Sequence, residues 1–553
     1  MSEQTDETGP GMRDGATPIS RRTAMRGALG TMAGALIPSV IDLNAARTMA
    51  QGAPGPEGPA GPMTYEGLIA QAVELATRPY DPPSDDLPPE LAALSYDVYQ
   101  AIRFRPEHAL RLGRRFSAQM FHRGFLQRRR VALFLQPRDG GPRTVAYDPG
   151  QFDLGAALSG RSFPASLGFA GFRLHYAFDE ARPDDRDEFC VFLGASYFRL
   201  RGRGQVYGLS ARGVAVGTGG PGAEEFPGFR AFWVVEPGEA DATLTVLALL
   251  DGPSLSGAYR FSVLPGDPSR IAVEASLHPR RDIARLGLAP LTSMFLYGQN
   301  GPGARGAAGF DEFRPQVHDS DGLAVAQPGD RLWRPLTNGR PQPQVSAFRV
   351  DPLDGFGLLQ RERRFPAYLD VQARHEDRPG LWVSARQGFG AGAVQLYEIP
   401  SRQEYDDNVV AAFVPGAPVP AGRPLALAYD LTTVGREPAP GLPDDLARVV
   451  STRVGSAERL RPSNPPSPQR RLYVVDFEGP GLPSDPNARV EVSLSASAGA
   501  FVEPYAERVP QTGGWRLYAE YRPPNPAPSG DVVLRARLAF AGRPITETWD
   551  AVA

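Results

Sequence analysis

The sequence contains no lysine and only one cysteine. All 59 of its Lys and Arg residues are arginines, and 62 acidic residues bring the net charge to -3. Nucleic-acid-binding domains carry a basic excess on one face, so this balance argues against a nucleic-acid partner. Cys190 lies in the apolar stretch FCVFLGASYF. It has no partner for an internal disulfide, and a buried core position is expected for it.

The sequence also offers no segment suited to a retained transmembrane helix. The apolar stretch over 27–41 is too short and too rich in Gly to span about 30 Å of hydrocarbon. It follows Arg21 and Arg22 and precedes small residues at 45–50. That order predicts a twin-arginine signal peptide over 1–50, export to the periplasm and no stable membrane anchor after processing. A disordered Pro/Gly/Ala linker is expected over 51–63.

Several chemical motifs are missing. The sequence has no Gly-x-Ser-x-Gly elbow and no phosphate-binding loop, and its six histidines are scattered. His318 is flanked by Asp319 and Asp321, but no second His–carboxylate cluster accompanies it. We therefore expect no metal and no other cofactor.

Glycine and proline, by contrast, are abundant. The 61 Gly and 57 Pro residues fall between short apolar runs, a pattern typical of an all-β protein. Helical periodicity is clear mainly over 65–77 and 89–102. The many strand-sized runs over 64–433 predict one large β-sandwich with long loops.

The C-terminal part shows the alternation of apolar and polar residues that antiparallel sheets produce. It occurs over 490–498, 515–521 and 532–540. A small sandwich of immunoglobulin type, without the cysteine pair, is therefore expected over 467–553. The Pro- and Arg-rich segment 434–466 is expected to be the linker before it. Nothing in the sequence signals the oligomeric state, and a homodimer is compatible with it.

Two polar strings carry carboxylates beside His, Ser and Asn. They are HDSDG over 318–322 and EYDDN over 404–408, with Trp333, Tyr368 and Trp382 in the same stretch. Two opposed carboxyl groups are the minimum equipment for most glycoside hydrolysis, and flat aromatic faces suit sugar rings. Each string also has a structural interpretation: a turn, a cap before a strand, or core aromatics. Residue types alone leave these alternatives open.

Longer strings resemble the OpgG/OpgD (MdoG) family of periplasmic glucan biosynthesis proteins, with the export signal closer to the OpgD branch. The matching strings are YDVYQAIRFRPEHAL (96–110), LGFAGFRLHY (167–176), FLGASYFR (192–199), YGLSARG (207–213), EEFPGFRAFW (224–233), LLDGPSLSGAYRF (249–261), APLTSMFLYGQN (289–300), RPQVHDSDGL (314–323), WRPL (333–336), GFGLLQRERRF (355–365), DDNVVAAFVP (406–415) and, more loosely, VVDFEGPGL (474–482).

The resemblance implies a large galactose-mutarotase-like β-sandwich followed by a small immunoglobulin-like domain. It implies a role in making osmoregulated periplasmic glucans, with β-1,2-glucan as the polysaccharide partner and inverting endo-glucanase or related transglycosylase activity. Carried over residue by residue, Asp407 is the general acid, Asp319 the general base and Glu404 a supporting carboxylate. The remaining positions are expected to bind substrate: Arg314, His318, Asp321, Trp333, Arg361, Tyr368, His375 and Trp382.

The sequence departs from the family pattern near these positions. Gln316 and Gln299 stand where Glu is usual, His375 where Tyr is common, and Ser384-Ala385 where Glu-Pro is usual. The loop over 301–310 looks lengthened. These departures support an alternative, a non-catalytic glucan-binding or scaffolding protein of the same pathway. A mutarotase-like isomerase is a weaker alternative, because fold does not fix function.

Overall fold

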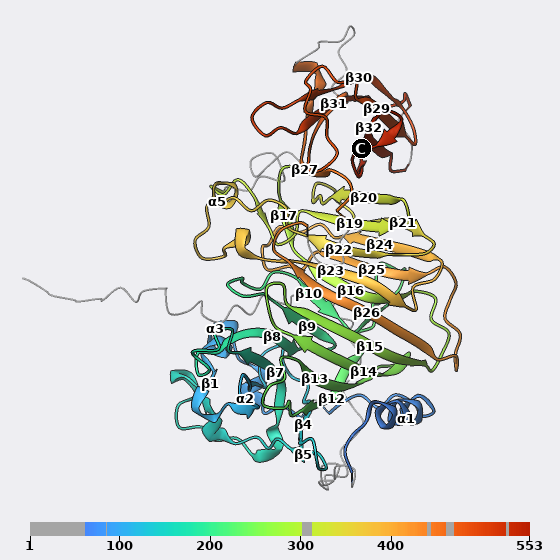
Figure 1. The fold of residues 1–553 in the computed structure, drawn as a ribbon. Helices are drawn as coiled ribbons and strands as arrows, with labels where there is room; N and C mark the ends of the chain where they lie inside the picture. Colours follow the sequence, from blue (N-terminus) through green and yellow to red (C-terminus); the bar gives the residue numbers. More distant parts are fainter. Residues whose placement is uncertain (1–60, 85, 301–311, 439–443, 460–468, 527–529) are drawn as a thin grey trace, which may run out of the picture.

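The computed structural model describes residues 61–553 without 85, 301–311, 439–443, 460–468 and 527–529, and these residues build layers of β-sheet (Figure 1). The expected signal peptide and nearly all of the expected linker lie outside them. Strands dominate this part of the chain, so the predicted all-β class is confirmed. Within it, no helix is both long enough and apolar enough to cross a membrane.

Most of the described strands belong to two large sheets. The first has the order β2 (Leu110–Leu112), β3 (Phe116–His122), β7 (Phe169–Tyr176), β8 (Asp187–Leu193), β9 (Tyr197–Leu200), β10 (Ser210–Arg212), β16 (Leu286–Ser293), β25 (Val409–Pro415), β24 (Gly392–Glu398) and β21 (Gln344–Val350), with β11 (Val214–Val216) also paired to β16.

The second sheet is longer and runs through both parts of the molecule. Its order is β29 (Glu491–Ala496), β32 (Val533–Phe540), β34 (Thr548–Val552), β20 (Asp330–Pro335), β19 (Gly322–Gln327), β22 (Gly355–Leu359), β23 (Gly380–Gln387), β26 (Leu425–Val434), β15 (Arg270–Pro279), β14 (Leu255–Leu264), β13 (Leu244–Asp251), β12 (Gly228–Val235), β4 (Ala132–Gln136) and β5 (Arg143–Thr144), with β33 (Arg543–Pro544) paired to β32.

The main core lies between these two sheets. Alternate residues of β15, among them Ile271 and Val273, are fully buried against it. Phe192 of β8 meets Phe261 of β14 edge to face, with ring centroids 5.2 Å apart. Such contacts between strands of different sheets make this part a β-sandwich, as predicted. Cys190 is buried in the same core, which confirms its expected position.

Helices are few among the described residues. Helix α1 (Tyr65–Ala76) begins at the expected place, where the Thr64 hydroxyl accepts a hydrogen bond from the Gly67 amide at 3.0 Å. It covers the outer side of β13 and β14 through Leu68 and Ala72 (Figure 1). The predicted helix over 89–102 is instead two short helices, α2 (Pro89–Ala92) and α3 (Tyr96–Ala101). A new helix begins after Ser95, whose hydroxyl accepts a hydrogen bond from the Val98 amide and so caps α3.

A third sheet completes the C-terminal part, at the red end of the chain (Figure 1). It has the order β27 (Arg448–Ser456), β28 (Arg471–Glu478), β31 (Trp515–Arg522) and β30 (Ala500–Arg508). It packs on β32 and β34 around a core that includes Val475, Leu517 and Leu534. Strand β27 lies inside the segment predicted as linker, so the linker is shorter than expected. Sequence reasoning missed this strand because the segment lacks a long apolar run.

The two parts are joined by backbone pairing as well as by side chains. Strand β20 pairs in parallel with β34, which places Trp333 beside Trp549. The core of the C-terminal sandwich also includes Trp382 and Leu359 from the large part. The C-terminal domain therefore shares a sheet and a hydrophobic core with the large one.

Gly322 shows how tight this junction is. A Cβ added there would lie 2.1 Å from Cζ2 of Trp333. We expect Gly322→Ala to lower the free energy of unfolding by about 1–3 kcal/mol or more, because a close-packed core accommodates an extra methyl group only by moving its neighbours. Chemical denaturation followed by tryptophan fluorescence measures the change. Gly339→Ala is the matched control, since its nearest neighbour would lie 3.8 Å away. Equal midpoints for both variants would contradict the expectation.

Candidate active site

Asp319 follows the short strand β18 (Val317–His318), which pairs with β17 (Phe295–Tyr297). Its backbone amide donates to the Met294 carbonyl at 2.9 Å, which fixes the backbone here. Its Oδ1 accepts a hydrogen bond from Arg378 Nη1 at 2.6 Å and lies 3.1 Å from His375 Nδ1. Burial alone would raise the pKa of Asp319, but Arg378 and His375 outweigh burial and lower the pKa to about 2. Asp319 is therefore a carboxylate at neutral pH.

Asp407 precedes strand β25 on a loop anchored by Asn408. The Asn408 side chain accepts from the Phe295 amide at 2.9 Å and donates to the Phe295 carbonyl at 3.0 Å. The Asp407 side chain is 20% exposed, and the nearest cation is Arg199, with Nη2 3.9 Å from Oδ2. Burial raises the pKa of Asp407 to about 6, with Arg199 opposing and the negative charge of Asp319 adding to the increase.

The two carboxyl groups thus have opposite pKa shifts while interacting with each other. One stays ionised through the neutral range, and the other keeps a proton up to about pH 6. Pairs of titratable groups whose surroundings separate their pKa values commonly serve as the acid and the base in catalysis. The arrangement can donate a proton from Asp407 and accept one at Asp319.

Glu404 lies on the loop before Asp407 and is 40% exposed. Arg314 ties it to two other carboxylates. Arg314 Nη2 donates to Glu404 at 2.7 Å and to Glu312 at 2.7 Å, and Nη1 donates to Asp370 at 2.8 Å. Three loops distant in sequence therefore meet at one guanidinium group. Arg314 is expected to act by holding these loops in place.

His318 and Asp321 lie on the same short segment as Asp319. His318 is fully buried and stacks on Phe295, with Nδ1 2.8 Å from Gln360 and Nε2 3.0 Å from Gln316. Asp321 accepts hydrogen bonds from the backbone amides of residues 361 and 362 at 2.8–3.0 Å. These contacts make both residues supports for the loop that carries Asp319, and neither has a free polar atom facing a sugar.

Four predicted binding residues are enclosed by other side chains, and their role in binding stays a prediction. Trp382 and Tyr368 are fully buried, and Trp333 is 4% exposed, so none of them presents a free ring face to a sugar. Arg361 stacks on Trp333 at 3.6 Å and forms ion pairs with two glutamates of the interdomain region. The sequence could not reveal this, because aromatic and Arg residues occur equally in binding sites and in cores.

The departures from the family pattern separate into two places. His375 contacts Asp319 directly. Gln299 and Gln316 instead line an open pocket between the large part and β27. Gln299 donates to Glu362 at 3.1 Å and accepts from Ser451 at 2.7 Å. His318, Asp321, Trp333 and Arg361 line the same pocket.

Sequence reasoning missed three residues that the structure brings to the site. Arg378 pairs with Asp319, Arg199 approaches Asp407, and Asp370 joins Glu404 through Arg314. Arg199 ends one of the family-like strings, FLGASYFR, which was the available signal. Arg378 and Asp370 stand in no motif, because their roles arise from contacts between segments far apart in sequence.

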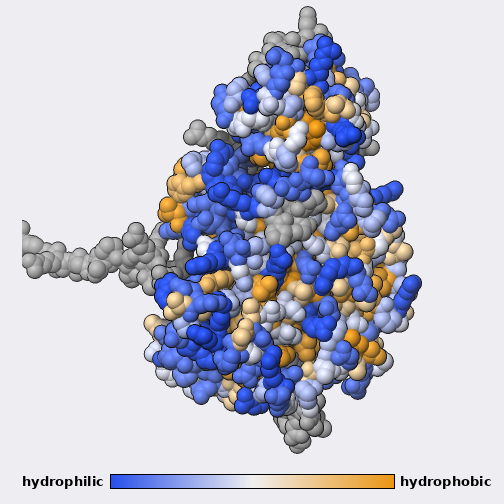
Figure 2. Space-filling model, viewed as in Figure 1, coloured by the Kyte–Doolittle hydropathy of each residue, from blue (hydrophilic) through white to orange (hydrophobic). Residues whose placement is uncertain are grey.

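Exposed apolar side chains lie near the loop of Asp370 and the loop of Glu404. Figure 2 shows an orange patch over α5 (Phe365–Tyr368), to which the exposed side chains of Phe365, Leu369 and Val371 belong. Tyr405, beside Glu404, is also 49% exposed. Exposed apolar side chains next to charged loops can take part in binding a ligand with both polar and apolar faces.

The family model described as "Periplasmic glucan biosynthesis protein, MdoG" matches residues 63–552. A "Glucans biosynthesis protein G" of Shewanella frigidimarina is 43% identical over 486 residues, 87% of this chain and 83% of that protein. The chain belongs to this family. Its Bradyrhizobium diazoefficiens relative of the same name is 38% identical over 96% of this chain and 99% of that protein. A Rhodopseudomonas palustris relative of the same name is 40% identical over 89% of this chain and 94% of that protein.

As a family member, the chain takes part in glucan biosynthesis, and the periplasm is its place of action. The three relatives carry the name of protein G, so the expected likeness to the OpgD branch stays a prediction. The twin-arginine export route also stays a prediction, since residues 1–60 lie outside the described part.

Proposed function

We propose that the protein acts on the β-1,2-linked glucan backbone as an inverting endo-glucanase or a related transglycosylase. The observation that carries the proposal is the pair Asp407 and Asp319, whose pKa values of about 6 and about 2 suit an acid and a base at one site. The choice of β-1,2-glucan comes from the family resemblance. The mechanism needs neither a cofactor nor a nucleotide.

In the proposed reaction, Asp407 donates its proton to the glycosidic oxygen as the bond to the anomeric carbon breaks. A water molecule attacks that carbon from the opposite face, and its proton passes to Asp319. Attack on a β-linkage from the opposite face gives an α-configured product. In transglycosylation, a sugar hydroxyl takes the place of the water. Arg378 stabilises the ionised form of Asp319 before the reaction, since it donates to the same carboxyl.

The Glu404 loop is proposed to support the acid. The ion pairs of Arg314 hold Glu404 to Asp370 and so fix the loop that continues to Asp407. The exposed apolar residues over α5 and the ring of Tyr405 lie on the adjoining loops and can pack against the C–H faces of glucose units. Fixing these loops places the acid, because catalysis depends on geometry held within fractions of an ångström.

The direct test is incubation of the purified protein with linear β-1,2-glucan, followed by mass spectrometry of the products. Shortened chains indicate hydrolysis, and cyclic or lengthened chains indicate transfer. Proton NMR in the first minutes should show an α-anomer at the new reducing end. Glucan binding by calorimetry without any change in chain length would contradict the proposal. It would favour the non-catalytic alternative, which the replacements at Gln316, His375 and Ser384 support.

The pH profile is a second prediction. Asp407 must be protonated to act, and burial holds its pKa at about 6, so kcat/KM should fall about tenfold per pH unit well above pH 6. Asp319, with its pKa of about 2, should give no opposing decline between pH 4 and 6. Initial rates between pH 4 and 8.5 test this, with circular dichroism confirming that the fold persists. A rate that is constant from pH 5 to 8 would contradict the assignment of the acid.

A further inference from the structure

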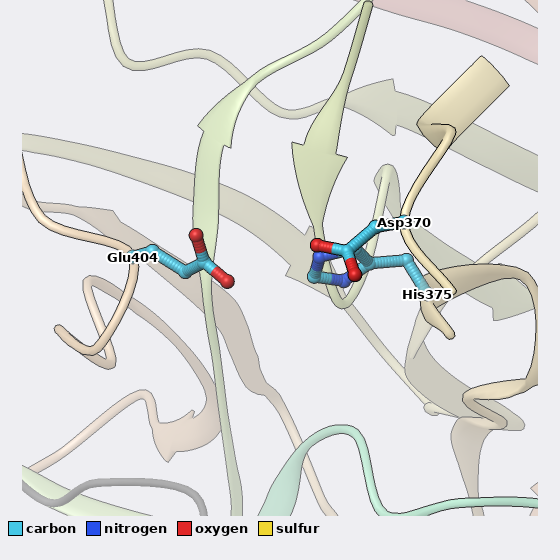
Figure 3. Close-up of side chains that lie close together, drawn as sticks. All are labelled: Asp370, His375 and Glu404. Carbon is cyan, nitrogen blue, oxygen red and sulfur yellow. The ribbon is translucent and has the colours of Figure 1, made fainter. Parts of the chain in front are cut away.

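Three side chains from two loops meet beside Asp319. Asp370 follows α5, His375 begins the short helix η6 (His375–Asp377), and Glu404 reaches toward them from the opposite loop (Figure 3). One potential ligand atom from each residue lies within 4.8 Å of the other two. The donor set is one imidazole nitrogen and two carboxylate oxygens. Such a set suits zinc and related transition metals better than Mg²⁺ or Ca²⁺, which prefer oxygen alone.

The imidazole of His375 supplies an independent observation. Its side chain is fully buried, and Nε2 makes no hydrogen bond with any described residue. Its other nitrogen, Nδ1, faces the Asp319 carboxylate at 3.1 Å. Metal-binding histidines characteristically donate one ring N–H to a carboxylate and present the other nitrogen to the ion. A His375 ring that donates from Nδ1 to Asp319 presents the lone pair of Nε2, as a metal ligand requires.

The charges of the cluster also fit a divalent cation. Arg314 is surrounded by Glu312, Asp370 and Glu404, so one positive charge faces three negative charges. The excess of two negative charges matches one divalent ion. The guanidinium contacts Oδ2 of Asp370 and Oε2 of Glu404, while Oε1 of Glu404 accepts no hydrogen bond from a described residue. Metal-binding carboxylates are themselves commonly hydrogen-bonded in this way.

We propose that His375, Asp370 and Glu404 form a binding site for one divalent transition-metal ion of the zinc class. Ligand atoms about 2.1 Å from such an ion stand roughly 3.4 Å apart in a tetrahedron, so the cluster must contract slightly on binding. Glu404 is 40% exposed on a loop and can make that movement. Water would complete the coordination. The ion would bridge the Glu404 loop and the turn that carries His375, next to the Asp319 carboxylate.

The competing explanation is that Arg314 alone satisfies the cluster. It accounts for the two carboxylates, but it does not account for the unpartnered nitrogen of His375. Spacing along the sequence gave no sign of this site, because its three residues are spread over 35 positions between 370 and 404. The proposal stands apart from the glucan chemistry, so its test does not use enzymatic activity.

The test uses untagged mature protein freed of metal by a chelator. Zn²⁺ is titrated by calorimetry, and Co²⁺ by its visible d–d absorption, which reports coordination by nitrogen and oxygen. We expect one tight site per chain that persists in excess Mg²⁺. Glu404→Gln and His375→Gln should each weaken binding by more than about 10-fold, because even outer-shell partners of metal ligands are worth 10–100-fold.

His108→Gln is the matched control, since His108 is exposed and is the kind of residue that collects adventitious zinc. Its affinity should equal that of the unmodified protein. Glu404→Gln changes an exposed side chain and is expected to leave the fold intact, which circular dichroism checks. No binding to the unmodified protein, unchanged binding in Glu404→Gln, or equal loss in His108→Gln would each overturn the proposal.

Discussion

Replacing Asp407 with Asn is expected to lower the rate of β-1,2-glucan cleavage by about 10³-fold. An amide cannot donate the proton that the leaving oxygen needs, and general acids contribute on the order of 10²–10⁴-fold. The substitution keeps the shape of the side chain. It also keeps the neutral state that burial favours in Asp407, whose pKa is raised to about 6. The fold should therefore be preserved, and the loss should appear in kcat.

The measurement compares initial rates on linear β-1,2-glucan with rates on an aryl glucoside oligomer carrying a good leaving group. Because an activated leaving group needs no acid, the variant should lose much less on the aryl substrate. The decline of kcat/KM above pH 6 should disappear as well. Asp406→Asn is the matched control, since Asp406 is the adjacent carboxylate and accepts a hydrogen bond from the Ser401 hydroxyl at 2.7 Å. If both variants lose the same fraction of the cleavage rate, Asp407 is not the general acid.

The second large effect concerns stability. Glu547 of the C-terminal part is fully buried and accepts hydrogen bonds from Arg361 at 2.6 and 3.3 Å and from the Val449 amide at 2.7 Å. Arg331 lies 3.2 Å away. Glu547→Ala is expected to lower the free energy of unfolding by about 3–5 kcal/mol, because it leaves buried guanidinium groups short of a counter-charge.

Chemical denaturation followed by tryptophan fluorescence provides the measurement, since Trp333 and Trp549 both lie at this junction. Glu491→Ala on the exposed edge strand β29 is the control and should change stability by less than about 0.5 kcal/mol. A double-mutant cycle that adds Arg361→Met should recover part of the loss, because the unpaired charge is then removed too. Additive losses in that cycle would argue that Glu547 acts only through the Val449 amide.

Much of the architecture could be predicted from local patterns. Alternation over 515–521 became β31, in which Trp515, Leu517, Ala519 and Tyr521 are buried. The predicted helix at 65–77 became α1. Both patterns depend on which side chains share a face, and that is a property of neighbours in sequence. Strand β27, inside the segment expected to be a linker, was not predicted, for the opposite reason. Strand β27 is defined by its pairing with β28 and by the core it joins, and neither is visible in its own residues.

The candidate site, too, has residues that the sequence predicts and residues whose role only the fold reveals. The resemblance pointed to Asp319, Glu404 and Asp407 because their strings are continuous in sequence. It could not separate residues that surround the carboxyls from residues that build the junction. Trp382 and Arg361 were expected to bind substrate, yet one is core and the other neutralises interdomain glutamates. Burial is set by the surroundings in space, and an Arg or Trp side chain is suited to either position.

The sequence by itself determined the all-β class and the family, because these depend on composition, periodicity and long contiguous strings. Only the tertiary structure decided the protonation states. Asp319 and Asp407 are the same residue type, and Arg378 beside one and burial around the other separate their pKa values. It also decided that Asp370, His375 and Glu404 meet. Electrostatic energies depend on distance and burial, and the folded chain sets both.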